Sequence, residues 1–149
     1  MALFVLFMAG LLMLTFQNGQ EWMRARSMAE AIERLRAGIG VNTTPFHTIR
    51  NYIKYAPTSD WLRVNIVGNI VMFIPWGFGL PLLWKKYRSF FMLAFLSLLL
   101  PVCIEFVQLF VGRTVDVDDV ILNFAGSMLG GALFLIMRVL IPKIGKLAK

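Results

Sequence analysis

Most of this chain is organised as apolar runs long enough to cross a membrane. A transmembrane helix requires about 20 mostly apolar residues, and residues 64–84, 89–112 and 119–142 each meet that length. Residues 1–17 form a shorter run without the basic start or small-residue cleavage site of a signal peptide, so we interpret it as a further transmembrane helix. A hydrophobic content of 58% exceeds that of a soluble domain. The sequence therefore predicts an all-α integral membrane protein with four transmembrane helices in a single domain, residues 1–149.

The basic residues predict how these helices are oriented. Two clusters lie beside predicted spans and consist of Lys85, Lys86 and Arg88, and of Lys143, Lys146 and Lys149. Short loops rich in Lys and Arg stay in the cytoplasm. Both termini are therefore expected to be cytoplasmic and residues 18–63 to be outside, although Arg24 and Arg26 beside the first span favour the opposite orientation. We attribute the net charge of +7 to this topology and to contact with anionic membrane lipid, and expect no nucleic-acid partner.

The outside loop carries a helical pattern of its own. Met28, Ile32 and Leu35 recur at helical spacing among charged residues, which predicts a short amphipathic helix ending at Gly38. This helix either prolongs the first span or lies on the outer leaflet. A second short run, residues 49–53, follows Pro45 and suits the membrane interface.

Polar side chains inside the predicted spans mark a candidate site. An ionised side chain at the centre of a membrane helix costs at least about 2.5 kcal/mol, yet Glu105 lies within the third run, three residues before Gln108. At a rise of about 1.5 Å per residue, Glu105, Asn69 and Asn123 all fall in the outer third of the membrane. We therefore expect a polar pocket open to the outside, with three acids at its rim: Asp116, Asp118 and Asp119.

Carboxylates and amides at such a site suit a hard cation, an ammonium group or acid–base chemistry. Asp116, Asp118 and Asp119 are candidate ligands of a divalent metal, but the Gly and terminal Glu of an EF-hand loop are missing. Two structural alternatives stay open. Asp118 or Asp119 caps the fourth helix, or Glu105 pairs with Arg113 or hydrogen-bonds to Gln108 or Asn69. With His47 as the single histidine, a His-rich metal site is excluded and no cofactor is predicted.

Small residues on the fourth span suggest a packing face. Gly126 and Gly130 form a GxxxG pair on the same helix face as Asp119 and Asn123. Such a pair lets a second helix approach closely, so a homo-oligomer through Gly126 and Gly130 is compatible with the sequence.

Taken in order, these motifs resemble the VanZ-like family. The residues that carry the resemblance are Val41-Asn42-x-x-Pro45-Phe46-x-Thr48-Ile49, Asn65-x-x-Gly68-Asn69-x-x-x-Phe73-Ile74-Pro75-x-Gly77-Phe78, Glu105-x-x-Gln108, Gly112-Arg113, Asp116-x-Asp118-Asp119 and Asn123-x-x-Gly126. The set runs from about Val41 through the last span, and it departs from the family form at Thr43-Thr44.

The resemblance implies a small multi-pass protein of the bacterial plasma membrane, in a family whose founding member is linked to teicoplanin resistance. The residues expected to bind a ligand are Asn69, Glu105, Gln108, Arg113, Asp116, Asp118, Asp119 and Asn123. One hypothesis is a non-catalytic protein whose outward pocket binds a lipid head group, a lipid-linked cell-wall precursor or a lipoglycopeptide. The alternative is an intramembrane enzyme acting on a lipid-linked phosphate or sugar, with Glu105 as general base and the three aspartates holding a metal.

Overall fold

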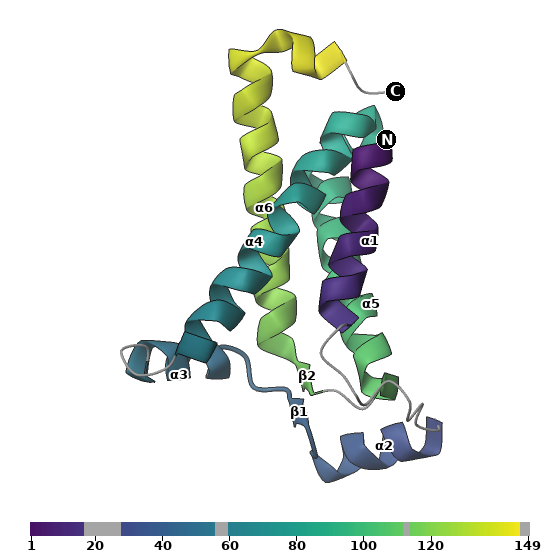
Figure 1. The fold of residues 1–149 in the computed structure, drawn as a ribbon, viewed down its shortest axis with the longest axis vertical. Coiled ribbons are helices and arrows are strands. Elements are labelled where there is room, and N and C mark those ends of the chain that lie inside the picture. Colours follow the sequence, from purple (N-terminus) through teal and green to yellow (C-terminus); the bar gives the residue numbers. More distant parts are fainter. Residues whose placement is uncertain (17–27, 56–59, 112–113, 147–149) are drawn as a thin grey trace.

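Four helices form the body of the protein. The computed structural model describes residues 1–16, 28–55, 60–111 and 114–146. The four helices are α1 (Ala2–Phe16), α4 (Asp60–Leu83), α5 (Phe90–Val111) and α6 (Val117–Leu140), which run along the long axis in Figure 1. Three of the helices in these ranges contain stretches long and apolar enough to cross a membrane: Asn65–Leu83, Phe90–Phe110 and Val117–Leu140. At 15 residues, α1 is shorter than a standard span, and a fourth crossing stays a prediction.

The connecting elements gather at the two ends of this bundle. One end carries α2 (Met28–Ala37), β1 (Val41–Asn42), α3 (His47–Tyr55) and β2 (Val115–Asp116), as Figure 1 shows. We call it the loop end. The other end carries two 3₁₀ turns, η3 (Lys85–Arg88) and η4 (Pro142–Lys146), and we call it the basic end. The helix α2 covers the segment in which the sequence predicts an amphipathic helix. The strands β1 and β2 pair in parallel, Val41 with Val115 and Asn42 with Asp116, which the sequence did not predict.

The helix pair α4 and α6 is packed backbone to backbone. A Cβ atom added at Gly126 would overlap the carbonyl oxygen of Ile70, and one at Gly130 would overlap that of Ile74. Gly77 on α4 meets the backbone of Ser127 in the same way. The small-residue face of α6 is thus filled by α4 of the same chain, which is the close approach of a helix that the GxxxG pair predicts. Association of two copies through another surface stays a prediction.

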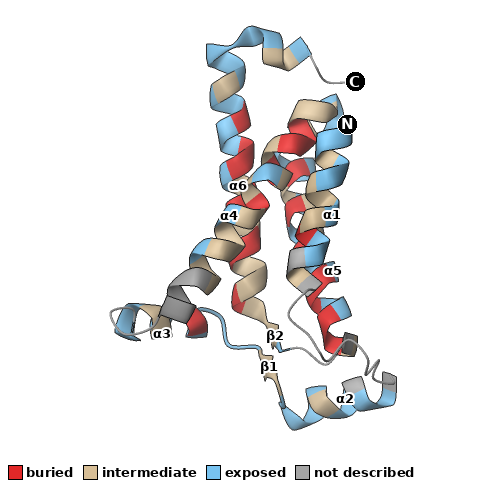
Figure 2. Ribbon diagram, viewed as in Figure 1, coloured by how far each residue is buried: buried red, intermediate tan, exposed pale blue. Residues whose placement is uncertain are grey.

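Aromatic side chains hold α1 against α4. The ring of Phe4 stacks on that of Trp76, with centroids 5.6 Å apart. Deeper in the bundle, Leu11, Phe73 and Ile104 form a buried apolar cluster that joins α1, α4 and α5. Figure 2 shows buried residues where the helices face one another and exposed ones on the outer faces. These outer faces are apolar, as expected of a surface in contact with lipid rather than water.

Candidate functional site

The turn between α5 and α6 is organised by Asp116. This residue is the N-cap of α6, in an extended conformation with φ −130° and ψ 118°, and its carboxylate accepts a hydrogen bond from the backbone N–H of Asp118 at 2.9 Å. A side-chain acceptor at this position satisfies one of the N–H groups left free at a helix start. The sequence left open a cap at Asp118 or Asp119, whereas the structure has Asp116 in that position.

Asp116 also binds the segment that follows β1. Its Oδ1 accepts a hydrogen bond from Asn42 Nδ2, and its Oδ2 accepts one from Thr48 Oγ1, both at 2.8 Å. Backbone pairing runs alongside, because Val115 N donates to Gly40 O at 2.9 Å. The loop before α3 is therefore fastened to the start of α6.

Asp118 completes this connection from within the protein. Its side chain is fully buried. Its Oδ1 accepts from Phe46 N at 2.5 Å and its Oδ2 accepts from Thr48 N at 2.6 Å. These two amides lie at the start of α3, where the helix dipole favours a negative charge. We call the four residues Asn42, Thr48, Asp116 and Asp118 the loop clamp.

The loop clamp presents an exposed tip, residues 43–46. Thr44 N donates to Asn42 Oδ1 at 3.1 Å, which closes a tight turn at its start. Phe46 has φ of +64°, a left-handed conformation that is unusual for a bulky residue. Its side chain is 52% exposed. Backbone strain of this kind is stable only when its surroundings impose it, and the bond from Phe46 N to Asp118 is one such restraint.

Two polar groups from the helices reach the same region. Glu105, on α5, is 6% exposed and accepts a hydrogen bond from Asp116 N at 3.0 Å. On α4, Asn69 Nδ2 donates to Asp119 Oδ1 at 2.7 Å. The structure thus links α4 and α5, through one side chain each, to the acidic start of α6.

The remaining expected site residues are placed differently. Gln108 is buried on α5, one turn after Glu105. Asn123 is also buried, and its Oδ1 has no hydrogen-bond partner among the described residues. Its backbone oxygen accepts a bond from Ser127 Oγ. Arg113 lies outside the described residues, and so does the pair that we expected it to form with Glu105.

The three aspartates do not have the arrangement of a metal site. Within the described ranges, no group of three or more His, Cys, Asp or Glu side chains is positioned to hold a metal ion. Both oxygens of Asp118 are directed at backbone amides, and Asp119 is bound to Asn69 on another helix. The divalent cation that the sequence left open therefore has no support from the described residues and stays a prediction.

Three residues of this site were not expected from the sequence. Asn42 and Thr48 provide side chains of the loop clamp, and Phe46 provides the exposed ring. All three stand in the motif around Pro45, which runs from β1 into the first turn of α3. A polar motif in the connection between the first two apolar runs, far in sequence from the acidic turn, was the available indication that the two segments meet.

Comparison with known proteins agrees with the motif order. The family model described as VanZ/LLP1 matches residues 1–138, nearly the whole chain. No curated protein and no solved structure matches the chain significantly. This chain therefore belongs to the VanZ-like family, a family of membrane proteins of the teicoplanin-resistance type.

Proposed function

We propose that this protein lowers the susceptibility of a bacterium to teicoplanin-type lipoglycopeptides by binding an envelope molecule at its loop end, without chemical turnover. The observation that carries this proposal is the state of Asp118, whose two carboxylate oxygens both accept backbone hydrogen bonds. A buried carboxylate used in this way shapes a loop and is closed to solvent. The acidic motif is then a scaffold for a binding surface.

The orientation that this function requires has support from charge. The start of α1 and the end of α6 lie at the same end of the bundle in Figure 1. That end carries Lys85, Lys86 and Arg88, together with Lys143 and Lys146. Its connections are short and contain no acid, so we assign it to the cytoplasm by the positive-inside rule. The loop end also carries basic residues, which oppose this assignment: Arg34, Arg36, Arg50 and Lys54. The assignment puts the loop end outside, in a four-pass plasma-membrane protein with both termini cytoplasmic.

The exposed tip is the part of the loop end best suited to contact a ligand. Thr43 and Thr44 offer exposed hydroxyl groups, and Phe46 offers an exposed ring in a fixed position. Hydroxyl groups and an aromatic face suit the sugar or head-group region of an amphiphile. The ligand classes we propose are a lipid head group, a lipid-linked cell-wall precursor and the lipoglycopeptide itself, with Glu105 as the nearby negative charge for an amine.

The test is resistance in a susceptible Gram-positive host at matched membrane levels. The wild type is expected to raise the inhibitory concentration of teicoplanin selectively over that of vancomycin. Phe46→Ala and Phe46→Gly are both expected to lose the increase, because each removes the ring. Phe91→Ala, which removes an exposed ring near the basic end, serves as the matched control and is expected to keep it.

Two outcomes count against the proposal. If Phe46→Gly keeps full resistance, the left-handed backbone is needed but the ring touches no ligand. If the wild type raises neither inhibitory concentration, the protein acts on another envelope component.

Glu105 separates binding from the enzymatic alternative. Glu105→Gln keeps a side-chain oxygen to accept from Asp116 N but removes the negative charge and the base. An enzyme acting on a lipid-linked phosphate or sugar would lose all activity in Glu105→Gln and would depend on a metal. For a binding protein we expect partial resistance in Glu105→Asp, and ligand bound by purified protein without turnover.

A further inference from the structure

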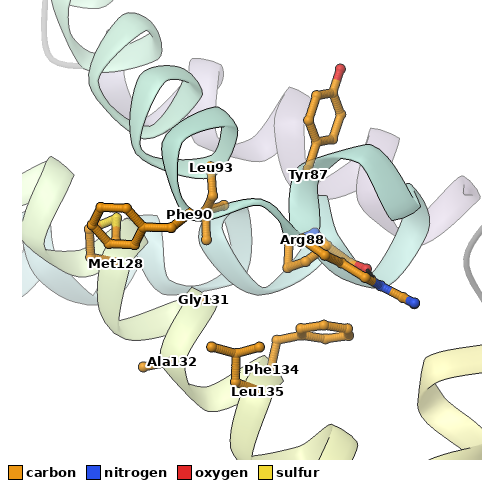
Figure 3. Close-up of a pocket in the computed structure, with 10 residues that line it drawn as sticks. Tyr87, Arg88, Phe90, Leu93, Met128, Gly131, Ala132, Phe134 and Leu135 are labelled. Atoms are coloured by element: carbon orange, nitrogen blue, oxygen red, sulfur yellow. Dashed lines mark hydrogen bonds between the residues drawn. The ribbon is translucent and has the colours of Figure 1, made fainter.

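A cavity lies at the basic end, away from the loop clamp. It has a volume of about 210 Å³ and lies between η3, the start of α5 and α6. Figure 3 shows Phe90 and Met128 at one side of this space and Arg88, above Phe134, at the other. Phe90 and Leu135 are 64% and 52% exposed, so the cavity opens on the outer, lipid-facing surface of the bundle.

The lining selects an apolar occupant. Apart from Arg88 and Tyr87, every residue around the cavity is apolar, as Leu93, Met128 and Phe134 illustrate. An apolar protein cavity of about 150 Å³ stays free of water and accepts a benzene ring. This one is larger, and its opening toward lipid suits part of an acyl chain.

Arg88 is held at the cavity in a fixed position. Its Nε donates to Pro81 O at 3.0 Å, and its Nη2 donates to Gly145 O at 2.8 Å. The guanidinium carbon lies 5.4 Å from the centroid of the buried Phe134 ring. These two bonds use two of its five N–H donors, and the others meet no acceptor in the described part of the chain. They are available to an anionic oxygen.

The surroundings of Arg88 carry one sign of charge. No Asp or Glu occurs in residues 61–104 or 120–149, the segments that build this end of the bundle. The exposed bases at this end, among the described residues, are Lys85, Lys86, Arg138, Lys143 and Lys146. A basic pocket between transmembrane helices on the cytoplasmic side is the arrangement that binds phosphate head groups.

We propose that this cavity binds one anionic glycerophospholipid of the cytoplasmic leaflet, with an acyl chain in the cavity and the phosphate at Arg88. The charge at the basic end determines the head group, and the apolar lining determines the chain. This site is separate from the loop end. It rests on the orientation proposed above but not on the ligand proposed for the loop end.

The test uses the full chain purified in detergent and native mass spectrometry of the lipids it retains. Phosphatidylglycerol and phosphatidylcholine with identical acyl chains are offered at equal concentration. The wild type is expected to retain one phosphatidylglycerol molecule in preference to phosphatidylcholine by about tenfold. Both lipids offer the phosphate to Arg88, but phosphatidylcholine also carries a choline cation, which the bases at this end repel.

Variants separate the two parts of the site. Ala132→Phe fills the cavity from an exposed lining position and is expected to abolish retention of phosphatidylglycerol. Leu133→Phe, next to it on α6 but outside the lining, is the matched control and is expected to retain it. Arg88→Gln is expected to remove the preference, whereas Arg50→Gln, on α3 at the loop end, is expected to leave it unchanged.

Arg88 also ties η3 to η4, so its loss risks misfolding. The double variant Lys85→Gln with Lys86→Gln changes only exposed charges and is expected to weaken the preference in a folded protein. Equal retention of the two lipids by the wild type would overturn the proposal. Unchanged retention of phosphatidylglycerol in Ala132→Phe would also overturn it, whether or not that variant changes the oligomeric state.

Discussion

Thr48 N donates a hydrogen bond of 2.6 Å to Asp118 Oδ2, although 70 residues separate the two in sequence. The bond joins the start of α3 to the start of α6 in a place that is closed to solvent. In such surroundings a hydrogen bond is stronger than in water, and leaving one partner unpaired is correspondingly costly. The loop end and the helical bundle are therefore expected to unfold together.

Replacing the buried carboxylate tests this coupling. Asp118→Asn leaves one acceptor oxygen for two amides and turns an NH₂ group toward the other N–H. We expect the free energy of unfolding to fall by about 2 to 3 kcal/mol, because a buried donor is left unpaired and a charged acceptor is lost. Thermal unfolding in detergent micelles measures the change.

The control is Glu33→Gln, an exposed acid on α2, which is expected to unfold at the wild-type temperature. If Asp118→Asn is as stable as this control, the loop clamp contributes nothing to the stability of the bundle. A loss of resistance without a loss of stability would instead assign Asp118 a direct role in binding.

The bond between Asn69 and Asp119 is predicted to couple α4 to the start of α6. In a double-mutant cycle with Asn69→Ala and Asp119→Ala, we expect a coupling free energy of about 1 to 2 kcal/mol, since the bond is charge-assisted and partly buried. Unfolding of the two single variants and the double variant measures this quantity. Additive effects would mean that the two side chains contact each other without stabilising the fold.

The long helices could be predicted from the sequence because lipid imposes a simple requirement. A run that crosses a membrane must be long and apolar, so the predicted residues 89–112 correspond closely to α5, Phe90–Val111. The ends of the helices depend on polar contacts instead. α6 begins at Val117 because Asp116 caps it, and α4 extends back to Asp60, beyond the apolar run.

The partners of individual residues could not be predicted in this way. The pattern Gly126-x-x-x-Gly130 indicates that a helix approaches closely, but it does not identify that helix; in the structure it is α4. Depth along the helices put Glu105 toward the acidic turn, and in the structure its side chain accepts a hydrogen bond from Asp116 N. It gave no reason to expect that Asn42 and Thr48 would use Asp116 as their acceptor, because that contact depends on the path of the loop.

Two fully buried serines are predicted to respond oppositely to the loss of their hydroxyl group. Ser97 Oγ has no hydrogen-bond partner among the described residues, whereas Ser127 Oγ donates to Asn123 O at 2.9 Å. Ser97→Ala is expected to leave stability unchanged or raise it, and Ser127→Ala to lower it by about 1 kcal/mol. Unfolding temperatures of the pair give the comparison. A clear loss in Ser97→Ala would reveal a bound water molecule that satisfies the hydroxyl.

The glycines of α6 offer a test of which helix they face. Gly126→Ala and Gly130→Ala each place a methyl group against a backbone carbonyl of α4, so we expect each to lower the free energy of unfolding by about 2 kcal/mol or more, as overpacking does. Gly68→Ala, on α4 with open space around its Cβ position, is the matched control and is expected to be neutral or slightly stabilising in a helix. Size-exclusion chromatography with light scattering measures the oligomeric state of the same variants. Were the two glycines instead at a contact between copies, the substitutions would dissociate an oligomer and leave the monomer as stable as the wild type.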